Sequence, residues 1–200
     1  MRSKSKGIIQ KFMEHIKFLE PEKFMEGILF CFGAPTIKGL KAACLINFRR
    51  NKNEDMRSLW KSKAGEWLDP LGVQWLLLNE HEASNNALVL IYRRELLARA
   101  LGCCEACEIL KAQGYPFNDL DACLTCLREK FQGDFPHEIG LFLDYPPRDV
   151  KGFMENQKCE NQLRPGYYWK VYGDIKKARQ TFRQYRRAEF DAARLILAGQ

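Results

Sequence analysis

The sequence predicts an α+β fold, in which a small antiparallel sheet is flanked by helices and the C-terminal half is rich in helix. Two apolar runs, 73–78 and 87–92, are separated by a polar stretch with turn-forming Ser and Asn, which is typical of a β-hairpin with a long loop. A third short apolar run, 43–48, predicts another strand. Apolar residues at helical spacing dominate the chain after Arg94. We therefore expect a sheet with helices on one face.

Helical periodicity also predicts the elements around these strands. Ile8, Phe12 and Ile16 give a first helix one apolar face, and Pro21 opens a second helix that ends near Phe32. Further helices are expected at about 56–68, 95–101, 103–113, 118–131 and 175–197.

The length of 200 residues fits one domain, with the sheet in about 1–101 and a helical part in about 102–200. The net charge of +7 and the basic pI favour acidic partners, such as nucleic acid, anionic lipid or acidic proteins. No apolar run approaches the ~20 residues of a membrane span. The chain begins with basic residues, but charged residues interrupt the apolar stretch that would follow them in a secretion signal. We therefore expect a cytoplasmic protein with no membrane partner and with reduced thiols.

Residues 137–156, HEIGLFLDYPPRDVKGFMEN, indicate a helical corner. Gly140 is a small residue that lets two helices cross closely, and Pro147 starts the second helix. Arg148 and Lys151 lie on its predicted outer side. The corner is either a helix-turn-helix that reads nucleic acid or a unit that packs or binds protein.

Two acidic residues favour the second interpretation. Asp144 stands where the turn of a helix-turn-helix favours Gly, and Asp149 would place an anion near phosphates at the helix start. The outer side of the second helix also carries few cations, with Asn156 beside them. We favour packing or protein binding over nucleic-acid reading.

His137 and Glu138 begin the corner. A histidine at a helix start can act as an acid or base, or bind an anion together with the helix N-terminus. More often it is a structural cap, and the local sequence contains no nucleophile motif. An enzyme that uses His137 is therefore an alternative rather than the favoured interpretation.

Two cysteine pairs have the spacing of a four-Cys zinc site. Cys104 and Cys107 form one pair, and Cys123 and Cys126 form the other after fifteen intervening residues. A helical hairpin that turns near Tyr115 would bring the pairs face to face, because residues i and i+3 share a helix face. Free cysteine is also a good small core residue, and we favour that interpretation. Zinc at these four thiols is the main alternative, and an iron–sulfur cluster is a less favoured one.

The last predicted helix, 175–197, carries a stripe of cations, and the segment 167–174 before it interleaves aromatic residues and a cation. A basic stripe can follow phosphates but is more often solvated. The preceding segment can stack a flat ligand, or it is an edge strand or extended segment with one buried side. The candidate binding residues in these two elements are Trp169, Lys170, Tyr172, Arg183 and Arg187.

Three phrases together resemble a known family: CFGAPTIKGLKAACLINF, FPHEIGLFLDYPPRDVKGF and YYWKVYGDIKKARQTFRQYRR. Their order and spacing are similar to those of the domain of unknown function 3793 family, which occurs mostly in anaerobic Gram-positive bacteria. The likeness covers about 30–190. This chain has Asp144 before Tyr145-Pro146, whereas the family usually has Gly at that position. The resemblance implies a cytoplasmic bacterial protein and implies no activity.

We therefore expect a non-enzymatic binding or regulatory protein. Its predicted contact surface combines the corner 137–156, the segment 169–174 and the basic last helix. The alternatives are a helix-turn-helix-like nucleic-acid binder, and a zinc protein or small enzyme.

Overall fold

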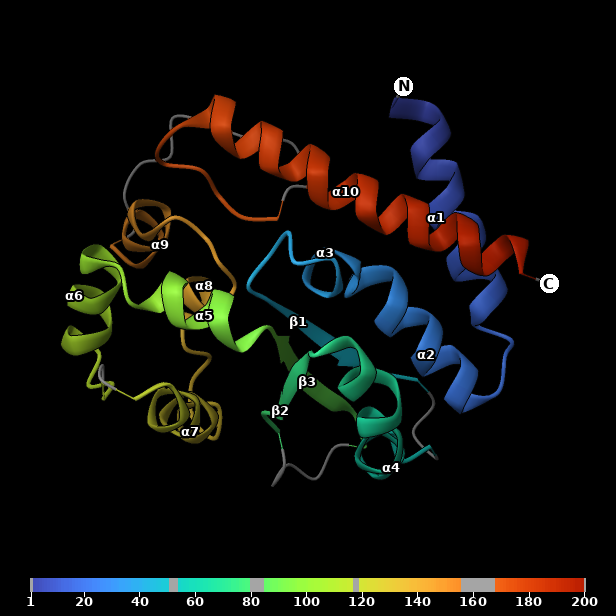
Figure 1. Ribbon diagram of the computed structural model, residues 1–200, viewed down its shortest axis with the longest axis horizontal. Helices are drawn as coiled ribbons and strands as arrows, with labels where there is room; N and C mark the ends of the chain where they lie inside the picture. The colour runs from blue at the N-terminus through green and yellow to red at the C-terminus, as the bar shows by residue number, and fades with distance from the viewer. Residues whose placement is uncertain (1, 51–53, 80–84, 117–118, 156–167, 200) are drawn as a thin grey trace.

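A computed structural model describes residues 2–50, 54–79, 85–116, 119–155 and 168–199. Asn156 and Tyr167 of the predicted elements lie outside these residues. A three-stranded antiparallel sheet lies at the centre of the molecule with helices around it, which confirms the α+β prediction (Figure 1). The strands, in the spatial order β1-β3-β2, are β1 (Ala43–Phe48), β3 (Ala87–Tyr92) and β2 (Gln74–Leu77).

The helices lie close to the predicted ranges. The N-terminal ones are α1 (Arg2–Ile16), α2 (Pro21–Phe32), α3 (Ala34–Ile37) and α4 (Met56–Leu68), which a 3₁₀ turn, η1 (Asp69–Leu71), extends. Those that follow β3 are α5 (Arg94–Leu101), α6 (Cys104–Ala112), α7 (Leu120–Lys130), α8 (Ile139–Phe142), α9 (Pro147–Met154) and α10 (Ile175–Ala198). Among the described residues, no helix is long and apolar enough to cross a membrane.

Helices cover both faces of the sheet, so the expectation of helices on one face is wrong. On one face Ile46, Val89 and Ile91 pack with residues of α1, α2 and α4 in a first core. On the other face Leu90 and Tyr92 pack with residues of α5 to α9 in a second core. The central strand β3 is an unbroken apolar run, ALVLIY, which is typical of a strand buried on both faces.

Aromatic side chains fill the first core below the sheet. Trp60 of α4 is fully buried, and its ring stacks on Phe48 of β1 with centroids 5.0 Å apart. The edge of Trp75 meets the same ring at 5.8 Å. Asp55 caps α4 by accepting hydrogen bonds from two backbone N–H groups of its first turn, which fixes the helix start.

The C-terminal helix α10 returns to the N-terminal half of the chain. It runs along one side of the molecule and packs on α1, α2 and α3 (Figure 1). Asp174 caps it by accepting from the N–H groups of Lys176 and Lys177. The described residues before it, 168–174, form bends and no strand, so they are not the predicted edge strand.

Candidate functional site

The corner between α8 and α9 is a tight packing joint. A Cβ atom on Gly140 would lie 2.8 Å from Cγ2 of Val150, so only glycine allows this crossing, as the sequence predicted. Asp144 adopts φ 61° in the turn, the left-handed region that favours Gly, Asn and Asp. Its Oδ2 accepts the backbone N–H of Ala42 at 3.1 Å, which ties the corner to the start of β1.

Asp149 is buried inside the protein and does not face a phosphate backbone, so the interpretation of it as an exposed anion is wrong. Its carboxylate accepts the indole N–H of Trp169 at 2.8 Å. It also accepts the backbone N–H groups of Tyr172 and Gly173, each at 2.7 Å. These bonds fix the segment before α10 against α9.

His137 and Glu138, two predicted site residues that are adjacent in the chain, lie in different surroundings. His137 is exposed and packs its ring against the edge of Phe153, with centroids 5.2 Å apart. Glu138 is buried, accepts the Tyr115 hydroxyl at 3.0 Å and lies 3.4 Å from the Lys130 ammonium. Glu138 therefore holds α7 and α8 together in the second core.

Arg148 and Lys151 line a groove of about 620 Å³ between α6 and α9. Glu105 and Glu108 of α6 and Glu155 of α9 line the same groove. The outer side of α9 is therefore flanked by another helix and by acidic side chains. Both features oppose insertion of α9 into a DNA major groove.

The aromatic segment before α10 is largely engaged in packing. The Trp169 ring stacks on Tyr145 at 4.7 Å and meets the edge of Phe182 at 4.4 Å. Tyr172 covers Gly152, where a Cβ atom would lie 2.6 Å from its ring. Lys170 is exposed, with its ammonium 5.3 Å from the Phe153 ring centroid.

The two candidate arginines of α10 point to solvent. Arg183 and Arg187 are exposed, and the guanidinium of Arg187 lies 3.9 Å from the carboxylate of Asp191. The opposite side of the helix buries Phe182 and Tyr185.

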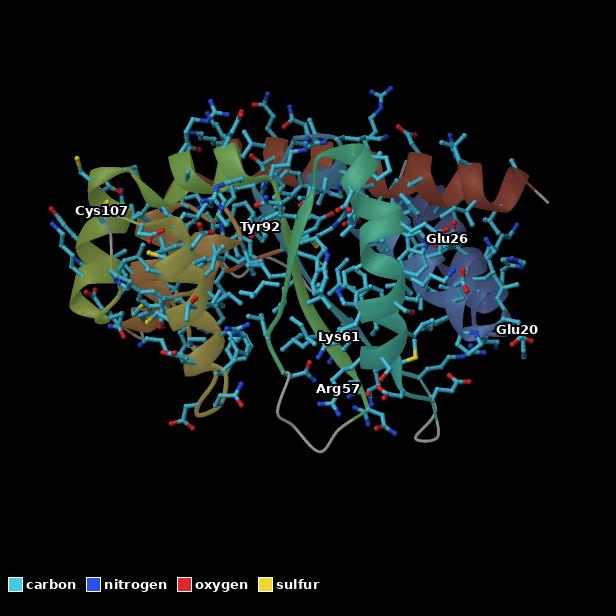
Figure 2. All side chains as sticks on the ribbon, turned by 60° about the horizontal axis from the view of Figure 1, so that its bottom comes forward. Glu20, Glu26, Arg57, Lys61, Tyr92 and Cys107 are labelled. Carbon is cyan, nitrogen blue, oxygen red and sulfur yellow. The ribbon has the colours of Figure 1, made fainter. Side chains whose placement is uncertain are left out.

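The cysteine pairs lie on α6 and α7. Cys107, at the outer end of the molecule in Figure 2, has its thiol 3.3 Å from the carbonyl of Leu101. The thiol of Cys123 is 2.8 Å from the carbonyl of Pro116, and burial raises the pKa of Cys123 to about 11. Within the described ranges, no three His, Cys, Asp or Glu side chains gather closely enough to hold a metal ion.

A cavity of about 420 Å³ lies along β1, on the side of the strand away from β3. Figure 1 shows that this side of the sheet faces α10. Its walls come from α2 and α3, from the corner and from α10. Apolar lining residues are Ile28, Phe32, Pro35, Leu45, Ile46 and Leu143, and polar ones are Lys41, Cys44, Asn47, Tyr145, Tyr168 and Glu189.

Lys41 is the unusual member of this cavity, because it is only 4% exposed. Its ammonium lies among three tyrosine rings, 5.3 Å from the centroid of Tyr145, 5.8 Å from Tyr168 and 5.7 Å from Tyr185. Aromatic faces attract a cation but do not accept its three hydrogen bonds. Among the described residues, none forms a hydrogen bond or ion pair with this ammonium. A buried lysine of this kind is costly to the fold unless something else contacts it.

Three neighbours of Lys41 are buried groups that either lack a hydrogen-bond partner or have a raised pKa. Burial raises the pKa of Glu189 above its ordinary value, although Tyr168 and Lys41 oppose the rise. The Tyr168 hydroxyl is buried and approaches Glu189 without reaching hydrogen-bond geometry, and no other described residue bonds to it. Burial likewise raises the pKa of Cys44, so its thiol is protonated at neutral pH. The cavity thus places one cation beside a buried carboxyl, a protonated thiol and a buried tyrosine hydroxyl.

A family model described as protein of unknown function (DUF3793) matches residues 29–200. The chain belongs to the DUF3793 family. This confirms the resemblance carried by the three sequence phrases. No curated protein and no solved structure matches the chain.

The three phrases that mark this DUF3793 chain meet at the cavity. Of the twelve described residues that line it, they supply ten, and the other two are Ile28 and Glu189. Sequence reasoning did not single out Lys41, although a lysine directly before the apolar run 43–48 was a signal for it. It also gave no role to Tyr145, because nothing local indicates that the corner and β1 come together.

Proposed function

We propose that this DUF3793 protein is a non-enzymatic binding protein whose ligand is a small carboxylic acid held in the cavity beside β1. The observation that carries the proposal is Lys41, a buried cation at the cavity with no hydrogen-bonding partner among the described residues. A volume of about 420 Å³ falls in the range of small-molecule sites. As the family resemblance implies, the proposed setting is the cytoplasm of a bacterium.

A carboxylate fits this cavity better than a phosphate. One ammonium balances one negative charge, whereas a phosphate monoester carries about −1.5 to −2 at pH 7. The surplus charge would lie near the carboxyls of Asp144 and Glu189, which both interact electrostatically with Lys41 and whose pKa values burial raises. The apolar walls at Ile28 and Phe32 suit the hydrocarbon part of such an acid.

The chemistry of the lining residues favours binding over catalysis. The Cys44 thiol is kept protonated by burial, and a protonated thiol is a poor nucleophile. Burial also raises the pKa of Tyr145, so its hydroxyl donates hydrogen bonds rather than accepting a proton. Groups of this kind hold a ligand in place without activating it.

A thermal-shift comparison of small carboxylic acids with their primary amides tests the proposal. The acids should raise the melting temperature, because a ligand that binds only the folded state stabilises it. The matched amides should not, because they lack the charge that Lys41 needs. Mass spectrometry of the bound acid after prolonged incubation should return it unchanged.

Two variants make the test specific to the cavity. Lys41→Met should abolish the response. Lys38→Met should retain it, because this substitution also removes one positive charge, but from an exposed side chain three residues away. Equal stabilisation by acids and amides, or an unchanged response in Lys41→Met, would overturn the proposal. Chemical conversion of the acid would replace binding with an enzymatic function.

A second candidate function is charge-driven binding of nucleic acid by α10. It is favoured by the exposed cations Arg183 and Arg187 on the outer side of this helix. Such binding should fall steeply with salt, because each neutralised phosphate releases counterions. In a gel shift at ~50 mM salt with micromolar protein, Arg183→Ala and Arg187→Ala should weaken binding to all sequences alike. No shift of any fragment would remove this candidate.

For the corner 137–156 we propose a role as a protein-contact surface. Its groove between α6 and α9 mixes Arg148 and Lys151 with glutamates over an apolar floor that includes Ile109 and Met154. If α9 read DNA instead, Arg148→Ala and Lys151→Ala would weaken binding in a sequence-dependent way.

A further inference from the structure

β1 is an edge strand, and the cavity follows its unpaired edge. Among the described residues the sheet has the order β1-β3-β2, so within them β1 pairs with β3 on one side only. Four consecutive residues of β1, 44–47, line the cavity on the other side. Unpaired strand edges present backbone N–H and C=O groups that can pair with an incoming extended chain.

The register of the sheet determines which backbone groups face the cavity. Arg93 donates its N–H to Ala42 at 2.9 Å, which marks these two opposing residues as a hydrogen-bonded pair. In an antiparallel ladder bonded and non-bonded pairs alternate. Cys44 and Ile46 therefore bond to β3, and Leu45 directs its N–H and C=O away from the sheet.

The other side of the sheet supports this assignment. Leu78 donates its N–H to Leu88 at 2.9 Å, so Leu88 and Leu90 bond toward β2. Val89 and Ile91 then bond toward β1, where their register partners are Ile46 and Cys44. By both routes the backbone groups of Leu45 and Asn47 point to the cavity and not to β3, and the Leu45 carbonyl has a long contact there, 3.9 Å, with the Cys44 thiol.

We propose that the ligand is a short extended peptide with a free C-terminal carboxylate, which adds to the sheet as a fourth strand against β1. The inference rests on the proposed function, since it gives the acid its chemical class. Lys41 precedes β1, so a carboxylate at Lys41 makes the ligand run antiparallel to the strand. Its backbone then pairs with Leu45 and Asn47.

The surroundings of the edge fit this occupant in size and polarity. From Leu45 to Asn47 the strand advances about 7 Å at ~3.3 Å per residue, which two or three peptide residues can pair with. Leu143 of the corner and Ile28 of α2 offer apolar contacts, and α10 contributes Glu189 to the wall. Helices beside an edge limit its pairing to a narrow chain, which protects the sheet from sheet-to-sheet association.

Three peptides distinguish carboxylate binding at Lys41 from strand addition to β1. The first is acetyl-leucyl-alanyl-leucine with a free carboxylate. The second carries a C-terminal amide, and the third has an ester in place of the amide between alanine and the last leucine. Ligand residues that bond to Leu45 and Asn47 are two apart, so the N–H of the last leucine faces Leu45 and the ester removes it. The C-terminal amide should lose binding, as should Lys41→Met with the first peptide. The ester should bind about two- to tenfold more weakly, since one backbone hydrogen bond contributes modestly.

Amide hydrogen exchange gives the site directly. On saturation with the first peptide, the N–H groups of Leu45 and Asn47 should exchange more slowly. Those of Cys44 and Ile46, already bonded to β3, serve as internal controls and should keep their rates. Unchanged exchange at Leu45 and equal affinity for the ester, with binding still dependent on Lys41, would overturn strand addition and leave the acid-binding function. If neither this peptide nor other acids bind in a Lys41-dependent way, the proposed function itself fails.

Discussion

Replacing Lys41 with methionine should leave the protein as stable as before or make it more stable. The change keeps a long side chain in the space and removes a charge that is only 4% exposed. Burying an ammonium costs several kcal/mol. Three tyrosine rings have their centroids between 5.3 and 5.8 Å from the ammonium, and each offsets this cost by about 0.5–2 kcal/mol through cation–π attraction. The two terms nearly cancel, so we expect a gain of between zero and about 2 kcal/mol in the free energy of unfolding.

Urea unfolding and thermal melting of both proteins, without ligand, measure this difference. A gain of 2 kcal/mol corresponds to a rise in Tm of about 4–8 °C for a chain of this length. Lys38→Met is the matched control, because it removes an exposed lysine and should change stability by less than ~0.5 kcal/mol. A loss of more than about 2 kcal/mol in Lys41→Met would refute the reasoning. It would mean that the tyrosines and carboxyls fully compensate the buried charge, so that Lys41 serves the fold and not a ligand.

Three further predictions concern the surroundings of the cavity. Gly140→Leu should lower the free energy of unfolding by about 1–3 kcal/mol, because its side chain would overlap Val150, and a Tm within a degree of wild type would contradict the tight corner. Asp149→Ala should cost about 3–5 kcal/mol in urea unfolding, since it leaves the Trp169 indole and two backbone N–H groups without their acceptor. The indole N–H resonance of Trp169 should shift in that variant, and an unmoved resonance would show that this bond is absent. Glu189→Gln should remove a pH dependence: burial raises the pKa of Glu189, so its contribution to stability is full below the ordinary value of 4.5 and is lost as pH rises through the folded value. The urea midpoint at pH 7.5, relative to the midpoint at pH 4.5, should therefore be higher in the variant than in wild type, and an identical change with pH in both proteins would count against this assignment.

The elements of this fold could be predicted from local patterns, and their partners could not. The apolar run 43–48 is β1 at the predicted residues, because β-branched and apolar side chains in a short run specify a strand. The expectation that helices lie on one face was wrong because ALVLIY was interpreted as one strand of a hairpin. Its unbroken apolar character meant burial on both faces.

The site illustrates the same limit. Gly140 was predicted correctly as a close contact, because a glycine before a Pro-containing turn is a local signal. Asp149 was interpreted as an exposed anion, because its three donors come from residues twenty or more positions later in the chain. Lys41 had no local signal beyond its place before a strand. What makes it unusual is the set of three tyrosines that only the tertiary structure brings around it.

The return of α10 to the N-terminal half has a consequence for the order in which the protein is assembled. Lys41 and Glu189 are almost 150 positions apart, yet both line one cavity. Contacts of such long sequence separation form only after large loops have closed, and they are entropically the slowest to appear. A ribosome-bound chain that has released α2 and β1 but not α10 therefore has no complete cavity. Occupancy of the cavity would report that α10 has been synthesised and has packed against the N-terminal half.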